Sequence, residues 1–465
     1  MNVEKTNRCT RGAWWLVLPI LALIATRLWI LAFFAPLGSD ADYYCQQAIK
    51  AVDGGLVPYS CELPIEYPPL SFRVLTLPRV VAHQRLAPDE PITREMFDGL
   101  LREYLPVHRG MMAVFDAASF VLLLLIVRRR RPADVVWCAW AYVVITTILA
   151  NLILERLDVG LLFFLLLWAW AWTAATDRRF DIWEAVAWAA LGLGAAYKLI
   201  PMLAVPVLLV WRWRSSGGGR GIGPVIGAVA VLAVTFTGPF AFEALRAGSG
   251  VLSVFTYHAE RGLHIESVLA SALLPLKPFG VSMHDEWTHR SLELMAPGAA
   301  ALAKASTWLL AAIVTGTSVW MARARCRPDR STAYRLALWT ISASLVVSKV
   351  LSPQFFIWAL PLLMLLGVEV CGKREFVGFL ALLVAIAGLT TWIYPYHYTP
   401  NIPGSSETIA IALSYFHPLA CGVLIARNVL LVAAVAWTGV RAFRVSALAL
   451  GESPGATESR AGRDQ

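Results

Sequence analysis

The sequence predicts an all-α polytopic membrane protein, and three observations lead to that prediction. Of the 465 residues, 58% are hydrophobic and only 15% are charged, with a mean hydropathy of +0.62. A soluble domain is nearer half apolar and a quarter charged. The apolar residues gather in blocks of about 17–23, the length that crosses ~30 Å of hydrocarbon as a helix. These blocks do not alternate every second residue, as the strands of a membrane barrel do.

About twelve blocks have the length and composition of spans. The first is not a cleaved signal peptide, because it is longer than an ordinary h-region and no Ala-x-Ala site precedes Pro36. Lys198 and Pro201 interrupt one apolar run, so the two spans within 183–211 are the least regular. The predicted spans are 14–35, 109–127, 133–150, 159–175, 183–197, 199–211, 222–240, 298–321, 334–350, 354–370, 377–393 and 418–440.

Charge predicts the orientation of these spans. With twelve spans, the basic clusters, such as Arg128 to Arg131 and Lys373 with Arg374, all fall on one side, which the positive-inside rule assigns to the cytoplasm. Both termini are then cytoplasmic. The first outer loop, 36–108, carries six Lys/Arg against ten Asp/Glu. The sequence pI of 9.3 therefore reflects topology and does not indicate nucleic acid as a partner.

The chain divides into a cytoplasmic N-terminus (1–13), a transmembrane domain (14–449) and a disordered cytoplasmic tail (450–465). Long outer loops are expected at 36–108 and 241–297, with a shorter one at 394–417. The cytoplasmic loops are too short for a nucleotide-binding domain, and no phosphate-binding glycine motif occurs in a strand-to-helix setting, so no cofactor is predicted. Of seven scattered cysteines, Cys45 and Cys61 share the first outer loop, where they could pair.

The first outer loop is predicted to begin with a short helix over 41–53. Ser39 or Asp40 could cap this helix, and Gly54 and Gly55 end it. Tyr44, Ala48 and Val52 recur at helical spacing and could lie against the membrane. Further on, Pro58-Tyr59 and Pro68-Pro69 are expected to hold the chain extended.

Asp40 and Asp42 are the first candidates for chemistry, since they follow the first span directly. One interpretation is a helix cap and a solvated loop charge. The other is a general base, a carboxylate that takes the proton of a sugar hydroxyl as the hydroxyl attacks an anomeric carbon. With a lipid-phosphate sugar as donor the leaving group needs no general acid, so one carboxylate suffices, whereas a glycosidase normally needs two.

Three segments carry a resemblance to a known family. They are Ser39-Asp40-x-x-x-Tyr44 with Glu66-Tyr67-Pro68-Pro69-Leu70, then Tyr257-His258-x-x-Arg261-Gly262-Leu263-His264-Ile265-Glu266-Ser267, then Lys349 to Trp358. Together they span most of the chain, and their order resembles glycosyltransferase family 87. That family includes mannosyltransferases of actinobacteria that use polyprenyl-phosphate mannose. His264 is a departure, because related sequences tend to have Gln there.

The resemblance implies a GT-C-type fold with an active site at the outer leaflet and an inverting transfer. It implies that Asp40 is the base, with Asp42 as a possible substitute. The predicted partners are a polyprenyl-phosphate sugar donor, a lipid-linked or glycan-linked acceptor, and membrane lipids. The residues predicted to bind substrate are Tyr44, Glu66, Tyr67, Asp158, His258, Arg261, His264, Glu266, Lys349 and Gln354.

Each of these substrate-binding predictions has a structural alternative. Arg261 and Lys349, like Arg156 and Lys198 at outer helix ends, could cradle a phosphate or could snorkel or form internal salt bridges. Glu155, Arg156 and Asp158 could pair among themselves, or Asp158 could hold the acceptor sugar.

The remaining polar and aromatic segments leave similar choices. His258, His264 and Glu266 fit no strong zinc spacing, so no metal site is predicted. Glu66 and Tyr67 could form a rigid turn or meet a sugar face. The Tyr394 to Tyr398 strip could bind the acceptor or belong to the aromatic belt. Arg27 and Asp116, both inside predicted spans, could pair with each other.

The favoured function is a membrane hexosyltransferase of the outer face that moves mannose, the sugar that the family resemblance implies. One alternative is a flippase or transporter of lipid-linked sugars. That activity would need polar residues near the middle of the spans, whereas most charges here gather at the outer rim. Another alternative is a lipid-linked glycan polymerase or ligase, which the sequence separates poorly from the first.

Overall fold

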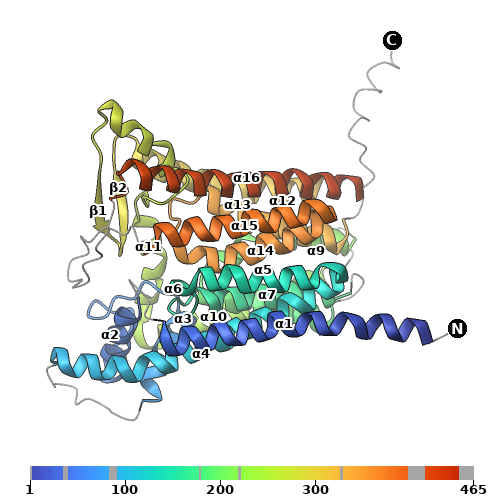
Figure 1. The fold of residues 1–465 in the computed structure, drawn as a ribbon. Helices are drawn as coiled ribbons and strands as arrows, with labels where there is room; N and C mark the ends of the chain where they lie inside the picture. The colour runs from blue at the N-terminus through green and yellow to red at the C-terminus, as the bar shows by residue number, and fades with distance from the viewer. Residues whose placement is uncertain are drawn as a thin grey trace.

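The computed structural model describes residues 3–34, 40–82, 92–176, 180–217, 221–324, 328–395 and 414–449. In these residues the fold is a bundle of α-helices with one small β-hairpin (Figure 1). The helices are α1 (Val3–Phe33), α2 (Ala41–Val52), α3 (Pro69–Val80), α4 (Arg94–Arg130), α5 (Val135–Ile148), α6 (Ala150–Ile153), α7 (Asp158–Ala174), α8 (Ile182–Tyr197), α9 (Val205–Ser215), α10 (Gly223–Ala247), α11 (Ser253–Glu260), α12 (Ala299–Arg323), α13 (Arg330–Val347), α14 (Phe356–Val370), α15 (Lys373–Ile393) and α16 (Pro418–Ala449). The strands are β1 (His284–Thr288) and β2 (Ser291–Met295).

The prediction of an all-α polytopic membrane protein is confirmed. Among the described residues, seven helical segments are long and apolar enough to cross a membrane: Trp15–Phe33, Arg94–Arg130, Gly223–Glu260, Ala299–Arg323, Pro353–Val370, Lys373–Ile393 and Pro418–Leu448. Three further apolar helices are shorter: Pro132–Ile148, Asp158–Ala174 and Ile182–Tyr197. Each of the twelve predicted spans contains a helix of the structure, although the number that crosses the membrane stays a prediction.

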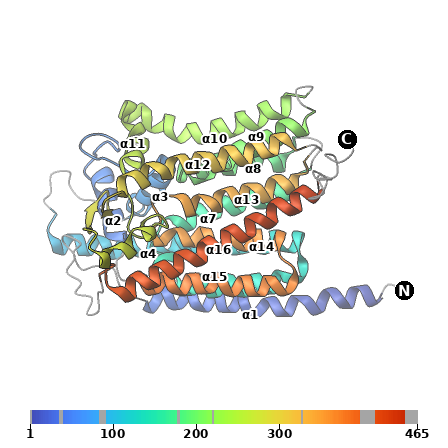
Figure 2. The same ribbon diagram turned by 90° about the horizontal axis from the view of Figure 1, so that it is seen from above.

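Helix α14 forms the centre of the bundle, and every residue in it except Glu369 is buried. It packs against α13, α15, α16, α7, α4 and α5. Figure 2 shows α10 and α1 along opposite edges, where their exposed apolar side chains are suited to lipid. Close packing requires small residues at some crossings. A Cβ on Gly160 of α7 would lie 2.4 Å from the hydroxyl oxygen of Tyr197 on α8.

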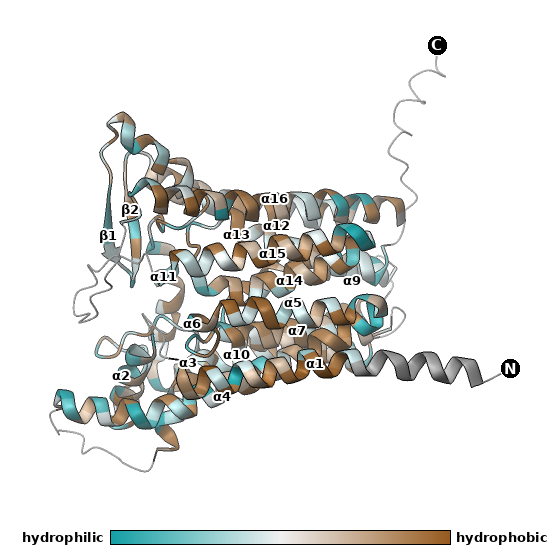
Figure 3. Ribbon diagram, viewed as in Figure 1, coloured by the Kyte–Doolittle hydropathy of each residue, from teal (hydrophilic) through white to brown (hydrophobic). Residues whose placement is uncertain are grey.

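The two ends of the bundle differ. Helices α2, α3 and α11 and the β-hairpin gather at one end, and the described termini, Val3 and Ala449, lie at the other (Figure 1). Figure 3 shows hydrophilic segments at the first end, beyond the apolar part of the bundle. Two described termini at one end agree with the predicted placement of both on the cytoplasmic side. The orientation relative to the cell stays a prediction.

Helix α2 confirms the predicted helix over 41–53 and ends before Gly55, which has a φ of +65°. Its packing was predicted wrongly. Tyr44 and Ala48 are buried and Val52 is half-buried, because α3 and α4 cover that face. Asp40 occupies the N-cap position but its side chain makes no capping hydrogen bond. Ser39, the other predicted cap, lies outside the described residues.

The chain after Pro68 was also predicted wrongly, since Pro68-Pro69 begins a helix instead of extending the chain. Pro69 is the first residue of α3, where the missing N–H has no helical partner to lose and the fixed φ suits a helix. Two more elements of the outer loops went unpredicted, the first turns of α4 and the β-hairpin. The predicted tail 450–465 and all but a few residues of the predicted loop 394–417 lie outside the described residues.

Candidate functional site

We call the end of the bundle that carries α2, α3, α11 and the β-hairpin the outer end, after its predicted orientation. The candidate base, Asp40, lies at the start of α2 and forms an ion pair with Arg156. Arg156 lies between α6 and α7, and it also donates to the Tyr394 hydroxyl over 2.6 Å. Its guanidinium carbon lies 5.7 Å from the Tyr394 ring centroid. The Asp40 side chain is 29% exposed, against 7% for Arg156. The carboxylate is thus held from one side and accessible from another.

The segment Glu155 to Asp158 makes the turn that brings charge to this end of the bundle. Its three charged side chains each pair with a residue of another segment. Glu155 accepts from Arg109 of α4 over 2.6 Å, Arg156 pairs with Asp40, and Asp158 pairs with Lys198. The three side chains point to different neighbours because the chain turns between α6 and α7. The hydroxyl of Tyr197 donates to Leu157 O over 2.9 Å and helps fix the turn.

Asp158 and Lys198 form a second carboxylate–cation pair two residues along from Arg156. Lys198 Nζ lies 2.7 Å from Asp158 Oδ1 and 4.7 Å from the Phe355 ring centroid. The indole N–H of Trp358 also donates to Asp158 Oδ1, over 3.2 Å. Lys198 follows α8 directly, where the helix breaks before Val205. Its side chain is 24% exposed, so a ligand can reach the ammonium.

More cationic groups approach from the second outer loop and the α13–α14 connection. His258 of α11 lies within electrostatic range of Lys198, Arg261 and Lys349. Lys349 Nζ donates to Ala259 O over 2.8 Å, which ties the two segments together. The Arg261 side chain has a buried Nε that makes no hydrogen bond.

Tyr44 lies one helical turn after Asp40, and its ring packs against that of Tyr67. Their rings meet edge-on with centroids 5.7 Å apart, and the Tyr67 hydroxyl donates to that of Tyr44 over 3.5 Å. Burial raises the pKa of Tyr44 well above its ordinary value, and the carboxylates of Asp158 and Glu66 add to the shift. Glu66 in turn lies 3.7 Å from Arg290 of the hairpin. The predicted residues Tyr44, Glu66, Tyr67 and Asp158 therefore lie in one connected region.

The structure can be set beside known proteins at this point. No protein-family model and no curated protein sequence matches this chain. The structure is similar to the crystal structure of ArnT from Cupriavidus metallidurans bound to undecaprenyl phosphate, with 16% sequence identity and a TM-score of 0.42. The match covers 92% of this chain and 77% of the ArnT chain. A similarity at this score carries no argument about the site, which rests on the residues of this chain.

Other predicted site residues lie apart from the exposed pairs. Asp42 is exposed on the first turn of α2, two residues after Asp40. Glu266 is fully buried, and its carboxylate accepts from Tyr415 over 2.7 Å and from Arg427 over 2.8 Å. His264 is buried beside it, and Gln354 Oε1 accepts from Ser352 over 2.5 Å. The protein partners of Glu266 fit a structural role better than a substrate contact.

The candidate metal ligands and the two cysteines of the first outer loop all lie among the described residues. There, no three His, Cys, Asp or Glu side chains group as metal ligands would, and His258, His264 and Glu266 form no such group. Cys45 is buried and Cys61 exposed, and both are free thiols. The predicted pair of Arg27 with Asp116 is confirmed at 2.7 Å. Of the aromatic strip, Tyr394 contacts Arg156, while Tyr396 and Tyr398 lie outside the described residues.

The sequence missed several residues of this region because their partners are distant in the chain. Arg109 looked like an ordinary charge at the start of a span, yet it meets Glu155 46 positions later. Tyr43 and Arg290 carried no motif. The sequence around Arg290 could have indicated a hairpin, because two short segments that alternate between polar and apolar residues flank His289 and Arg290. Each segment is only five residues long, so the alternation is a weak signal.

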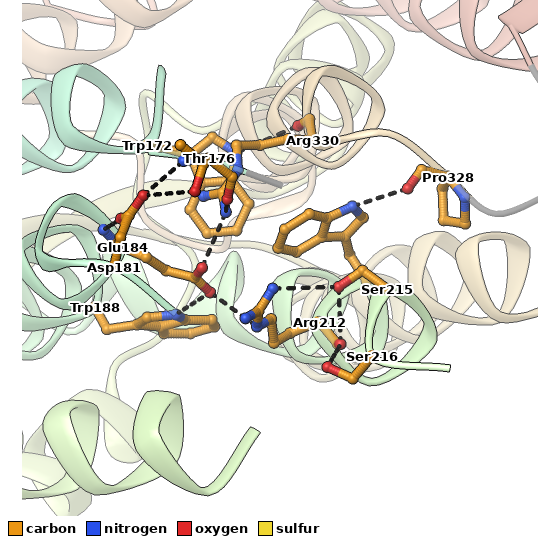
Figure 4. Close-up of polar contacts among 11 residues, drawn as sticks. Trp172, Thr176, Asp181, Glu184, Trp188, Arg212, Ser215, Ser216, Pro328 and Arg330 are labelled. Atoms are coloured by element: carbon orange, nitrogen blue, oxygen red, sulfur yellow. Dashed lines mark hydrogen bonds and ion pairs between the residues drawn. The ribbon is translucent and has the colours of Figure 1, made fainter. Parts of the chain in front are cut away.

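A second group of charges joins α8, α9 and α13 (Figure 4). Glu184 of α8 accepts from Arg330 of α13 over 2.9 Å and lies 3.2 Å from Arg212 of α9. The guanidinium carbon of Arg330 lies 4.7 Å from the ring centroids of both Trp172 and Trp211. We call Glu184, Arg212 and Arg330 the inner cluster. Its members are between 0% and 8% exposed, so it joins three helices and offers no accessible carboxylate.

Proposed function

We propose that this protein is an integral membrane glycosyltransferase of the GT-C type. It moves a hexose, mannose by the family 87 resemblance, from a polyprenyl phosphate to a lipid-linked or glycan-linked acceptor on the outer face. The observation that carries the proposal is the partly exposed Asp40 carboxylate, held by Arg156 near a second ion pair, the buried Asp158 with the accessible Lys198. All four groups lie at the end of the bundle that the charge pattern predicts to face outward.

Asp40 acts as the general base in this proposal. Its carboxylate takes the proton from the acceptor hydroxyl while the hydroxyl oxygen bonds to the anomeric carbon of the donor. The bond from that carbon to the phosphate oxygen breaks, and the electron pair leaves with the polyprenyl phosphate. Attack opposite the leaving group inverts the anomeric centre. Arg156 and Tyr394 support this role by fixing the carboxylate before the acceptor arrives.

Lys198, Arg261 and Lys349 suit the phosphate side of the same reaction. Negative charge grows on the phosphate as the glycosidic bond breaks, so cations placed there stabilise the transition state. Lys198 is accessible and paired to Asp158, which orients its ammonium. Arg261 supplies a planar guanidinium that matches two phosphate oxygens, whereas each lysine acts as a point charge. The three cations act on His258 together, which supports a common location.

The transfer function is favoured over a flippase by the position of the accessible charges. A flippase for lipid-linked sugars needs a polar route through the middle of the spans. Arg27 and Asp116, described residues inside the spans, bond to each other and to Thr146 and Tyr142 and are 8% and 1% exposed. A closed ion pair of this kind joins α1, α4 and α5 and offers no binding site for a sugar.

The test uses membranes that contain the full chain, with radiolabelled polyprenyl-phosphate mannose as donor and endogenous lipids as acceptors. Asp40→Asn keeps the size of the side chain and removes the base, so we expect transfer to fall by about 10²–10⁴-fold. Asp42→Asn is the matched control, because it removes an exposed carboxylate on the same turn, and it should retain most of the transfer.

Three results would contradict parts of this proposal. Transfer that survives Asp40→Asn would remove Asp40 as the base, and a loss in Asp42→Asn alone would move the base there. If wild-type membranes transfer no polyprenyl-phosphate sugar even after extracted outer-leaflet lipids are added as acceptors, the enzyme proposal fails and flipping should be measured. The amount of each variant in the membrane is determined beside its activity.

A further inference from the structure

The tip of the β-hairpin contacts segments outside the hairpin. Strands β1 and β2 pair from His284 with Met295 to Thr288 with Ser291, which leaves His289 and Arg290 as a two-residue turn. Both residues have positive φ, 46° and 56°. Such turns favour Asn and Gly, because larger side chains enter the left-handed region at a cost. The tip is therefore a conformation that its own residues do not favour.

Contacts with the rest of the outer end hold this tip in place. The Tyr257 hydroxyl of α11 donates to His289 O over 2.6 Å. The imidazole of His289 lies 3.3 Å from Glu293 of β2. The guanidinium of Arg290 lies 3.3 Å from the ring centroid of Tyr43 on α2, and its Nε lies 3.7 Å from Glu66. The tip thus places Arg290 over the first outer loop, next to the candidate site.

The four side chains Tyr43, Glu66, Tyr257 and Arg290, here called the hairpin cup, come from four separate segments. Glu66 also lies within electrostatic range of the Tyr257 hydroxyl. Arg290 is 41% exposed and its approach to Glu66 is too long for a hydrogen bond, so this contact can open for a ligand. Tyr43 is three residues from Asp40, about one helical turn of 5.4 Å. Through Tyr43, the cup therefore adjoins the helical turn that carries the proposed base.

We propose that the hairpin cup is the subsite for a neutral hexose unit of the acceptor, adjacent to the sugar that is extended. This inference rests on the proposed function. A hexose ring has an apolar C–H face that suits the ring of Tyr257. It also suits the ring of Tyr43, where the sugar takes the place of the Arg290 guanidinium. Its hydroxyls can donate to Glu66 and accept from Arg290. A phosphate is excluded by charge, because the Glu66 carboxylate beside Arg290 cancels the attraction.

The test measures sugar binding without any transfer. The full chain in detergent is observed by saturation-transfer NMR with methyl α-D-mannopyranoside and methyl α-D-glucopyranoside as probes. Glu66→Gln and Arg290→Gly should each weaken binding of the hexoside by at least about fivefold. Glu62→Gln and Arg246→Ala are matched controls from exposed positions at the same end, and they should bind like the wild type. Asp40→Asn should also bind, because it leaves the cup intact.

Arg290→Gly separates binding from folding. Glycine adopts the left-handed turn more easily than arginine, so the thermal midpoint should stay the same or rise while binding falls. In transfer assays the same variant should raise KM for the acceptor and leave KM for the donor unchanged. A change in the donor KM instead would overturn the assignment to the acceptor.

Two further outcomes would also overturn the hairpin cup. They are binding in Glu66→Gln and Arg290→Gly that equals wild type, and a wild-type protein that binds neither hexoside. A failure of the proposed function would look different. In that case the wild type would bind a hexoside through the cup and yet transfer no sugar.

Discussion

The outer site and the inner cluster are built from the same chemistry and differ in exposure. Each joins carboxylates to basic side chains across several helices and adds aromatic rings beside the cations. At the outer end, Asp40 is 29% and Lys198 24% exposed. In the inner cluster, Glu184 is 0% and Arg212 2% exposed. A charge that a substrate must reach remains partly exposed, whereas a charge that only holds helices together is covered.

The outer site and the inner cluster also differ in the number of cations that surround each carboxylate. Each outer carboxylate is matched with one main cation, so a bound anion or hydroxyl can exchange for that partner at modest cost. Glu184 is set between two arginines, and loss of its charge leaves both of them beside each other in a buried place (Figure 4). Removing one member of a buried ion pair costs far more than the pair contributes. The two regions should therefore respond to mutation in opposite ways.

The largest effect is expected from Glu184→Gln. The change leaves Arg212 and Arg330 without their carboxylate in a buried place, so unfolding should become easier by about 3–5 kcal/mol. Thermal unfolding of the full chain in detergent measures this loss. The transfer rate per folded molecule should change little, since the inner cluster lies at the opposite end from Asp40 (Figure 1).

Glu62→Gln is the control, because it removes an exposed carboxylate and should leave the unfolding midpoint unchanged. If Glu184→Gln unfolds like the wild type, the inner cluster does not stabilise the fold. If it abolishes transfer in protein that remains folded, the division between a structural and a functional end is wrong.

The comparison also shows which parts of the molecule could be predicted from the sequence. Spans are visible because each one must be apolar along its whole length, and every predicted span contains a helix. The pairings are different. Arg156, Asp158 and Glu155 are neighbours in the chain, yet their partners lie 116, 40 and 46 positions away. A local sequence pattern contains no information about those distant partners, so the sequence left open whether these adjacent charges pair with one another.

The outer loops were the hardest part for a related reason. Their helices and strands are short and only partly apolar, so periodicity is weak. Pro68-Pro69 is compatible with both an extended chain and a helix start, and only the packing of α3 on α2 decides between the two. Asp40 was singled out through its place after the first span and through family resemblance. Arg290, far along the chain, had neither signal.

A smaller effect is expected from Lys198→Met in the outer site. The change removes the accessible ammonium but keeps most of the length of the side chain, so transfer should fall by about 10²-fold, or ~2.7 kcal/mol of transition-state stabilisation. Stability should change less than in Glu184→Gln, because Asp158 keeps the indole N–H of Trp358 as a donor. The measurement is kcat and KM for the polyprenyl-phosphate donor.

Two variants sharpen this result. Lys50→Met removes an exposed lysine from α2 and should transfer like the wild type. The double variant Asp158→Asn with Lys198→Met removes both charges, so it should recover stability without recovering transfer. Recovered transfer in the double variant would mean that Lys198 only neutralises Asp158 and does not act on the donor.

The smallest expected effect concerns His264, which is buried between the outer site and Arg427. Burial, with Arg261 and Arg427 nearby, lowers the pKa of His264 from 6.5 to about 3. Its Nδ1 accepts from the Glu266 amide over 3.3 Å, which requires an unprotonated nitrogen. The folded protein thus binds fewer protons here than the unfolded chain, and the stability due to neutral His264 is lost as pH falls from 6.5 toward 3.

Glutamine at this position offers an acceptor and a donor without titrating. His264→Gln should therefore flatten the fall in stability between pH 7 and 5.5 by about 1 kcal/mol, measured as the pH dependence of thermal unfolding in detergent. His284→Gln in β1 is the control, because that imidazole is exposed. An equal slope in wild type and His264→Gln would mean that His264 gains a proton without loss of structure, and that the region between Glu266 and Lys349 is less closed than its contacts indicate. A flatter pH dependence in His264→Gln would show that His264, like the inner cluster, is a buried group that stabilises the fold, although it lies at the same end as Asp40.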